Sequence, residues 1–206
     1  MLKIWGRMSS INVKKVVWTA QELGLDFQRT EAGGLFGVVK TPEYMRLNPN
    51  SLVPVIEDED FVLWESNVIV RYLCARHSSS EFYPTELRER FSAERWMDWQ
   101  QTTLNPASRP GFWQLIRTPP DQRNAQLIAD SNAAVEALMA TLDAHLARHA
   151  FMGGERFSMA DIPVACEVHR WFGLPQQRQS RRNIERWYES LCARQASKGV
   201  LDLALI

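Results

Sequence analysis

Cysteine is scarce in this 206-residue chain, and the first 73 residues contain none. The three cysteines, Cys74, Cys166 and Cys192, form neither a C-x-x-C pair nor a zinc-binding spacing. A catalytic cysteine near the start of the chain is therefore excluded. Each cysteine lies among apolar residues in a helical pattern, which predicts three buried thiols that pack as small hydrophobic groups.

Charge of one sign and long apolar runs are also lacking. The 24 basic and 24 acidic residues give a formal net charge of +0 at pH 7, so neither nucleic acid nor an anionic membrane is an expected partner. No apolar run reaches the roughly 18 residues that span a bilayer, and no signal peptide is apparent. We therefore expect a cytoplasmic protein. The four histidines form no ligand pattern, so no metal is expected.

Strand and helix signals alternate over residues 1–77, which we expect to form one α/β domain. The apolar periodicity and the turn residues predict the elements in this order: strand Leu2–Trp5, a helix over Val13–Leu23, strand Asp26–Glu31, a helical turn over Thr41–Met45, strands Val55–Glu57 and Phe61–Trp64, and a helix over 65–76. The order β-α-β-α-β-β-α is that of a thioredoxin-like domain.

Strand signals disappear beyond a predicted linker, which contains serines 78–80 and Pro84-Thr85. Residues 87–206 are therefore expected to form an all-α helical bundle. Helices are predicted over 86–117, 121–149, 158–171 and 181–193, the first kinked or interrupted by Pro106 and Pro110. The second carries an apolar stripe, which consists of Leu127, Val135, Leu138, Met139, Leu142 and Leu146.

The segment from Asn48 to Leu73 carries the most specific functional signal. Its Val53-Pro54 bond is one of the few kinds that can be cis, which would leave the Val53 N–H and C=O free for an extended peptide. A helix that begins at Glu65 or Ser66 offers unpaired N–H groups to a carboxylate, and the Glu65 side chain can meet an amine. These features predict a site for a short peptide that carries both an ammonium and a carboxylate group.

This segment resembles the glutathione-binding core of the glutathione S-transferase family. The resemblance implies that Val53 pairs through its backbone with the cysteinyl unit, that Pro54 fixes this backbone, and that Glu65 and Ser66 hold the γ-glutamyl end. Lys40 matches a position where relatives place a basic or polar group on the glycyl carboxylate, although a solvated surface lysine is the alternative. The sequences LKIWG and FSMADIPVA are similar to the family's N-terminal and C-terminal domains.

The turn after the first predicted strand carries the candidate catalytic groups. A hydroxyl beside a helix N-terminus can donate a hydrogen bond to a thiolate and lower its pKa, which increases the nucleophilic fraction near pH 7. By resemblance, Ser10 aligns with the activating serine of serine-type transferases, the theta class among them, and Asn12 completes a Ser-x-Asn pattern of the nu class. Ser9 is a substitute for Ser10. The alternative is that Ser10 or Asn12 simply caps the helix.

The resemblance implies an enzyme of detoxification that conjugates glutathione, its co-substrate, to small hydrophobic electrophiles. Arg109, Phe112 and Trp113 are predicted to line the electrophile site. One alternative is a glutathione-dependent disulfide reductase of the nu type, and another is a non-catalytic binding or regulatory protein with the same fold. The resemblance also implies a homodimer. Trp96 and Trp99 are expected to be core or subunit-interface residues.

Overall fold

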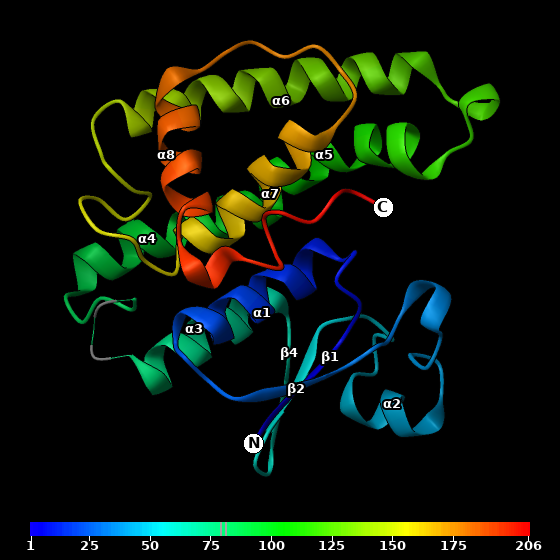
Figure 1. Ribbon diagram of the computed structural model, residues 1–206, viewed down its shortest axis with the longest axis vertical. Coiled ribbons are helices and arrows are strands. Elements are labelled where there is room, and N and C mark those ends of the chain that lie inside the picture. The colour runs from blue at the N-terminus through cyan, green and yellow to red at the C-terminus, as the bar shows by residue number, and fades with distance from the viewer. Residues whose placement is uncertain (79, 81) are drawn as a thin grey trace. The chain divides into compact units, whose positions relative to one another are not determined.

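The chain forms two units, Met1–Tyr83 and Pro84–Ile206, in a computed structural model that describes residues 1–78, 80 and 82–206 (Figure 1). The first unit is an α/β domain and the second is helical, so the predicted fold class is confirmed. Ser79, part of the predicted linker, lies outside the described residues.

The first unit contains every strand and helix that the sequence predicts, in the predicted order. The elements are β1 (Leu2–Trp5), α1 (Ile11–Glu22), β2 (Phe27–Thr30), α2 (Pro42–Leu47), β3 (Val55–Asp58), β4 (Phe61–Trp64) and α3 (Ser66–His77). A short 3-10 turn, Gly34–Phe36, precedes α2.

The strands form one mixed sheet in the order β2-β1-β3-β4. Strand β1 runs parallel to β2 and antiparallel to β3, which runs antiparallel to β4. In the register, Trp5 at the end of β1 lies opposite Val55 at the start of β3, and Val55 lies opposite Trp64 at the end of β4. The segments that follow β1, β2 and β4 and the segment that precedes β3 therefore meet at one end of the sheet.

Side chains alternate between the two faces of the sheet, as strand geometry requires. Ile4 and Ile56 are paired and fully buried, and α1 and α3 pack together along one side of the sheet (Figure 1). Val55 and Trp5 form a second cluster with Tyr44 of α2, whose ring lies edge-on to the Trp5 ring at a centroid distance of 5.9 Å. Helix α2 thereby anchors the chain just ahead of Val53 and Pro54.

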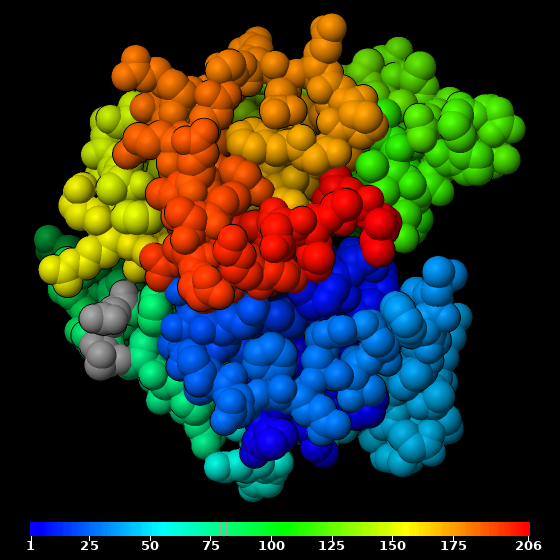
Figure 2. All heavy atoms as spheres, viewed as in Figure 1, coloured from blue at the N-terminus to red at the C-terminus, as the bar shows by residue number. Residues whose placement is uncertain are grey.

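The second unit consists of α4 (Leu87–Trp99), α5 (Asn105–Phe112), α6 (Ala125–Leu146), α7 (Asp161–Gly173) and α8 (Arg182–Cys192). Its last residues lie along the surface of this unit, shown in red in Figure 2, and the Leu203 carbonyl oxygen lies 2.8 Å from His169 Nε2 of α7. Within the described residues, no helix has both the length and the hydropathy needed to cross a membrane.

The two prolines expected to kink or interrupt the first long helix lie inside a helical course that continues from Leu87 to Arg117. Pro106 lies in the first turn of α5 and Pro110 lies within that helix. A π-helical turn, Gln100–Leu104, precedes α5, and a second, Trp113–Arg117, follows it. The wider turn ahead of Pro106 accommodates a residue that lacks an N–H, so the interruption is a change of helix type rather than an end.

Helix α6 is shorter than predicted at its start, because Asn124 caps it by accepting a 3.1 Å hydrogen bond from the Leu127 N–H. The expected burial of Leu127 is wrong, since this side chain is 44% exposed in the first turn. Val135, Met139, Leu142 and Leu146 are buried as predicted, whereas Leu138 is only half-buried. The first turn of α6 extends past the core that covers the rest of the helix.

A modified capping box precedes α7. The Asp161 carboxylate accepts a 2.8 Å hydrogen bond from the Ser158 N–H, and the Ser158 hydroxyl accepts one of 3.3 Å from the Ala160 N–H. The regular helix begins at Asp161, three residues later than predicted. The same carboxylate also accepts hydrogen bonds of 2.8 Å from the Met152 N–H and from the Trp187 indole.

The expectation of three buried thiols holds for two of them. Cys74 and Cys166 are both 1% exposed, whereas Cys192 is only half-buried. Cys192 is the last residue of α8, where the helix reaches the surface of its unit. All three cysteines are free thiols.

Candidate active site

The candidate residues of the first unit gather at one end of its sheet. Ser9, Ser10 and Asn12 follow β1, Val53 and Pro54 precede β3, and Glu65 and Ser66 follow β4. Because β1, β3 and β4 are neighbours in this register and adjacent strands lie about 4.8 Å apart, the three segments lie side by side. Lys40 lies in the connection from β2 to α2, and β2 ends beside β1 at the same end of the sheet.

The Val53–Pro54 peptide bond is cis, the form that the sequence allowed. Neither the N–H nor the C=O of Val53 has a hydrogen-bond partner among the described residues. These two groups are therefore available to the backbone of an extended peptide.

Two residues that sequence reasoning missed hold the chain just before Val53. The Tyr44 hydroxyl donates a 2.8 Å hydrogen bond to the Leu52 carbonyl, and the Asn48 side-chain amide donates a second one of 3.0 Å. Both side chains are 2% exposed, and burial raises the pKa of Tyr44, so its hydroxyl remains a donor. No local signal beyond an apolar position in a short helix marks Tyr44 for this role.

Gly6 allows the end of β1 to approach both α1 and Val53. A Cβ atom at this position would lie 2.3 Å from Val13 Cγ2 and 3.2 Å from Val53 Cβ, and the glycine φ of +147° disfavours other residues. Its carbonyl accepts a 2.7 Å hydrogen bond from Arg29 Nη1. Arg29 thereby fixes the strand end from which the Ser9-Ser10 turn departs.

The Ser10 hydroxyl is not used as a helix cap. Ser10 occupies the N-cap position of α1 with extended backbone angles, but its side chain accepts no hydrogen bond from the first turn. The alternative, that the Ser10 side chain simply caps the helix, is therefore wrong. Asn12 lies inside α1, and its buried Oδ1 has no hydrogen-bond donor among the described residues. Because buried acceptors normally have a hydrogen-bond donor, an unpartnered one can accept a hydrogen bond from a ligand.

The Glu65-Ser66 pair has an unusual backbone. Glu65 adopts φ 74° and ψ 107°, a sparsely populated region that costs a residue with a side chain about 1–3 kcal/mol and is typically found at functional sites. Its side chain makes no capping hydrogen bond, and Ser66 is 3% exposed at the first position of α3. Asn67 accepts a 3.1 Å hydrogen bond from the Lys15 ammonium, which connects α3 to α1.

Lys40 is exposed, and its ammonium forms no ion pair within the part of the chain that the structure describes. Phe36, in the turn before it, is 51% exposed. Across residues 1–78, 80 and 82–206, no group of three or more His, Cys, Asp or Glu side chains is arranged to hold a metal ion.

The predicted electrophile residues belong to the helical unit. Arg109 and Trp113 lie one turn apart and are exposed, Trp113 by 50%. Phe112 is only 9% exposed, because the guanidinium of Arg170 lies 4.8 Å and that of Arg117 lies 5.7 Å from its ring centroid. The structure therefore separates Phe112, which packs inward, from the two exposed residues.

A buried polar cluster supports this part of α5. The Glu167 carboxylate of α7 accepts hydrogen bonds of 2.9 Å from Arg170 Nη1 and from the Gln100 amide, and another from the Ser108 hydroxyl. Arg170 also donates a 3.0 Å hydrogen bond to Asn105 at the start of α5. Sequence reasoning missed Glu167 and Arg170, since an i, i+3 pair of opposite charges is usually exposed.

Comparison with known proteins supports the resemblance over nearly the whole chain. The family description "Glutathione S-transferase, N-terminal domain" matches residues 1–75, and "Glutathione S-transferase, C-terminal domain" matches residues 104–195. The chain is 39% identical to glutathione S-transferase GstB of Escherichia coli K12, with 98% of each chain covered. It is 29% identical to glutathione S-transferase 3 of Zea mays, with 95% of this chain and 90% of the maize protein covered.

A solved structure is similarly close. The theta class glutathione S-transferase of Xanthomonas axonopodis pv. citri, crystallised with glutathione bound, superposes with a TM-score of 0.96 at 40% identity. The match covers 100% of this chain and 99% of that one. The two family matches and the full-length relatives agree with one another. The chain belongs to the glutathione S-transferase family.

Proposed function

We propose that the protein binds glutathione at the sheet end of its first unit and uses the Ser10 hydroxyl to activate the thiol for conjugation. The observation that carries the proposal is the coincidence of three unused groups at one end of the sheet. These are the Ser10 hydroxyl, which does not cap α1, the unpaired N–H and C=O of Val53, and the start of α3 at Glu65 and Ser66. A relative at 40% identity was crystallised with glutathione bound.

Each group has a role that follows from its chemistry. The Val53 N–H and C=O pair with the backbone of the cysteinyl unit, as in the addition of a strand to a sheet edge. The γ-glutamyl carboxylate lies at the N-terminus of α3 near Ser66, and the Glu65 carboxylate meets its ammonium. Lys40 provides a positive charge for the glycyl carboxylate.

The Ser10 hydroxyl donates a hydrogen bond to the glutathione sulfur and thereby favours the thiolate over the thiol. The proton of the glutathione thiol leaves to solvent. The thiolate lone pair then forms a carbon–sulfur bond with the electrophile. In a substitution, the leaving group departs with the electrons of the bond that breaks. In an addition, the electrons of the broken π bond take up a proton. Ser10 is not covalently changed. Asn12 supports the sulfur through its side-chain amide.

We further propose that Arg109 and Trp113 contact a small hydrophobic electrophile, while Phe112 packs inward and supports this part of α5. Exposed aromatic surface suits planar, apolar compounds. The family resemblance also favours a cytoplasmic homodimer that acts in detoxification, with Trp96 and Trp99 near the contact between subunits.

The test compares Ser10→Ala with Ser9→Ala and Asn12→Ala in steady-state conjugation assays across pH. Loss of the donor should lower kcat/KM by about tenfold to a hundredfold and raise the pKa of bound glutathione by about 1 to 2. Ultraviolet difference absorbance of the thiolate measures that pKa directly. Ser9→Ala should remain close to the parent protein, and an unchanged Ser10→Ala variant would remove Ser10 from the mechanism.

A second candidate function is glutathione-dependent disulfide reduction, which the Ser10-x-Asn12 pattern favours through the resemblance to the nu class. In that reaction the thiolate attacks one sulfur of a disulfide, and the other sulfur leaves as a thiolate. Assays with a small dialkyl disulfide decide between the two activities. A protein that neither binds immobilised glutathione nor turns over either substrate would instead be a non-catalytic member of the family.

A further inference from the structure

The two residues proposed to contact the electrophile lie on the outer face of α5. Arg109 and Trp113 are exposed, whereas Ser108 and Phe112, about a quarter of a turn around the helix axis, are buried. The direction in which Arg109 and Trp113 point therefore depends on how α5 is rotated about its own axis.

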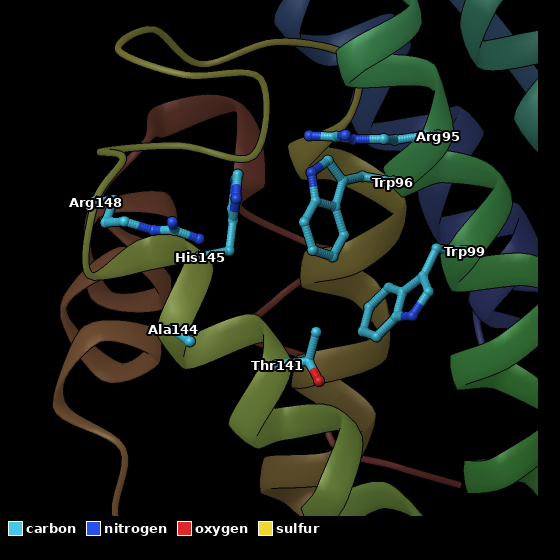
Figure 3. A pocket seen from close by; sticks show the side chains of 7 residues that line it. All are labelled: Arg95, Trp96, Trp99, Thr141, Ala144, His145 and Arg148. Carbon is cyan, nitrogen blue, oxygen red and sulfur yellow. The ribbon is translucent and has the colours of Figure 1, made fainter.

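The groove between α4 and α6 does not enclose this outer face. It is lined by residues of α4 and of the C-terminal part of α6, with Trp96 and Trp99 on one side and His145 on the other (Figure 3). In the part of the chain that the structure describes, none of the residues that line this groove belongs to α5. The direction of the outer face thus depends on the residues that are packed beneath α5.

A buried polar network, the Glu167 cluster, lies beneath α5 and consists of Gln100, Asn105, Ser108, Glu167 and Arg170. The Glu167 carboxylate accepts a 2.9 Å hydrogen bond from the Gln100 amide and another from the Ser108 hydroxyl. Arg170 Nη1 donates to Glu167 at 2.9 Å and to Asn105 Oδ1 at 3.0 Å. Every member except Asn105 is buried. Because hydrogen bonds are directional, this network fixes the rotation of α5 against α7, which an apolar contact alone does not.

The bond from Gln100 affects the direction of α5 in a second way. Gln100 is the first residue of the π-helical turn Gln100–Leu104, which directly precedes α5. A π-helical turn accommodates about one residue more than an α-helical turn, so its relaxation to the α form would rotate the following helix by about 100°. Arg109 and Trp113 would then leave the outer face. By holding Gln100, the Glu167 carboxylate stabilises the register that directs them outward.

Helix α6 supports α5 from another side. The Ser131 hydroxyl donates a 2.6 Å hydrogen bond to the Ala107 carbonyl and accepts one of 3.1 Å from the Gly111 N–H. A Cβ atom at Gly111 would lie 2.8 Å from Ser131 Oγ, so this close approach requires glycine. Ala107 and Gly111 lie roughly opposite the outer face. Helix α6 therefore holds α5 from behind, while Glu167 sets its rotation.

We propose that Gln100, Glu167 and Arg170 are positioning residues of the electrophile site. They touch no substrate and act by holding α5 in the rotation that presents Arg109 and Trp113 to the electrophile. A buried ion pair is costly to desolvate, and apolar residues of similar volume often stabilise a fold equally well, so the pair serves to select one arrangement. The inference rests on the proposed transferase function, because it concerns the site at which the electrophile binds.

The test removes the directional contacts and keeps the volume of the side chains. The triple variant Gln100→Met, Glu167→Met, Arg170→Met leaves no unpaired charge, so it should fold with a urea midpoint close to that of the parent protein. With glutathione and 1-chloro-2,4-dinitrobenzene, its KM for the electrophile should rise about tenfold, while its KM for glutathione stays unchanged. A KM for the electrophile equal to that of the parent protein would refute the proposal.

Trp113→Phe shows whether the cluster acts through the outer face of α5. In the parent protein this substitution should raise the KM for the electrophile by about threefold. In the triple variant it should have almost no further effect, because Trp113 no longer faces the substrate. A purely structural role of the cluster predicts equal effects in the two backgrounds, and that result would also refute the proposal.

Gln100→Met alone keeps the test decisive if the triple variant does not fold. It retains the pair of Glu167 and Arg170 and removes only the bond to the π-helical turn, so the KM for the electrophile should rise about threefold. An unchanged KM would count against the proposal. Glu136→Gln, which removes the partner of Arg181 in a pair outside the cluster, is the matched control and should leave both KM values unchanged.

Failure of the transferase function has a different signature. A parent protein that does not conjugate glutathione refutes the proposed function and this inference together. A parent protein that loses activity with Ser10→Ala, but whose KM for the electrophile is unaffected by the cluster variants, retains the proposed function and refutes this inference alone.

Discussion

The Tyr44 hydroxyl and the Leu52 carbonyl are joined by a 2.8 Å hydrogen bond that connects α2 to the residue before Val53. Asn48 donates to the same oxygen, so two buried donors hold one carbonyl. The position of the Val53 backbone therefore depends on a helix that contributes no group of its own to the proposed glutathione site.

Tyr44→Phe should raise KM for glutathione by about threefold and lower the free energy of unfolding by about 1 kcal/mol, with kcat little changed, because one donor to Leu52 is lost while Asn48 remains. Steady-state kinetics and chemical denaturation measure these effects. Tyr72→Phe is the matched control, since its hydroxyl donates a 2.8 Å hydrogen bond to Asp58 at the opposite end of β3. An equal rise in KM in both variants would contradict the role given to Tyr44.

Glu167→Gln should destabilise the helical unit by about 3–5 kcal/mol, because it leaves the buried Arg170 guanidinium without a countercharge. The Arg170 side chain is 9% exposed and that of Glu167 is 0% exposed. Glu136→Gln removes the partner of Arg181 in a more exposed pair and should cost about 1 kcal/mol or less. Urea denaturation compares the two, and similar losses would show that burial of the first pair is energetically unimportant.

Asp161 should make stability fall as pH rises from about 4 to about 6. Burial raises the pKa of this carboxyl from 3.8 to about 6, with the hydrogen bonds from Met152, Trp187 and Ser158 opposing the shift. Over that interval the folded protein binds more protons than the unfolded chain, so raising the pH favours unfolding, and above pH 6 the effect is complete.

Asp161→Asn removes this titration and leaves the other ionisable groups in place. The stability difference between the parent protein and the variant should therefore decline between pH 4 and 6, by at most about 1.4 kcal/mol per pH unit, and stay constant above pH 6. Urea unfolding at a series of pH values provides the measurement. A difference that is independent of pH would assign an ordinary pKa to Asp161.

Much of the fold was predictable because local patterns and tertiary packing agree. The apolar positions of Val13 to Leu23 and the short alternating strands gave the right elements in the right order. Helix ends were less predictable, since α6 starts at an asparagine cap and α7 starts three residues inside its capping box. Leu127 was misplaced because periodicity shows which face is apolar but not where the core ends.

The candidate site was predictable where function leaves a local signature. The Val-Pro dipeptide and the Glu-Ser helix start identified two of the segments that the sheet register brings together. Tyr44 and Arg29 left no such signature, because each acts through a partner at least eight residues away in the chain. Glu167 was missed because its pairing with Arg170, three residues away, resembles an ordinary exposed ion pair. The roles of Ser9, Ser10 and Asn12 remain a prediction that the proposed variants test.

The placement of cysteine has a consequence for durability. A catalyst that handles alkylating compounds risks losing its own thiols to them, yet no cysteine occurs before Cys74. Cys74 is 1% exposed, and burial raises its pKa to about 12, so the sulfur stays protonated and shielded. Each molecule of co-substrate thus brings its own reactive sulfur. The residues around the proposed site contain no thiol that an electrophile could modify during repeated turnover.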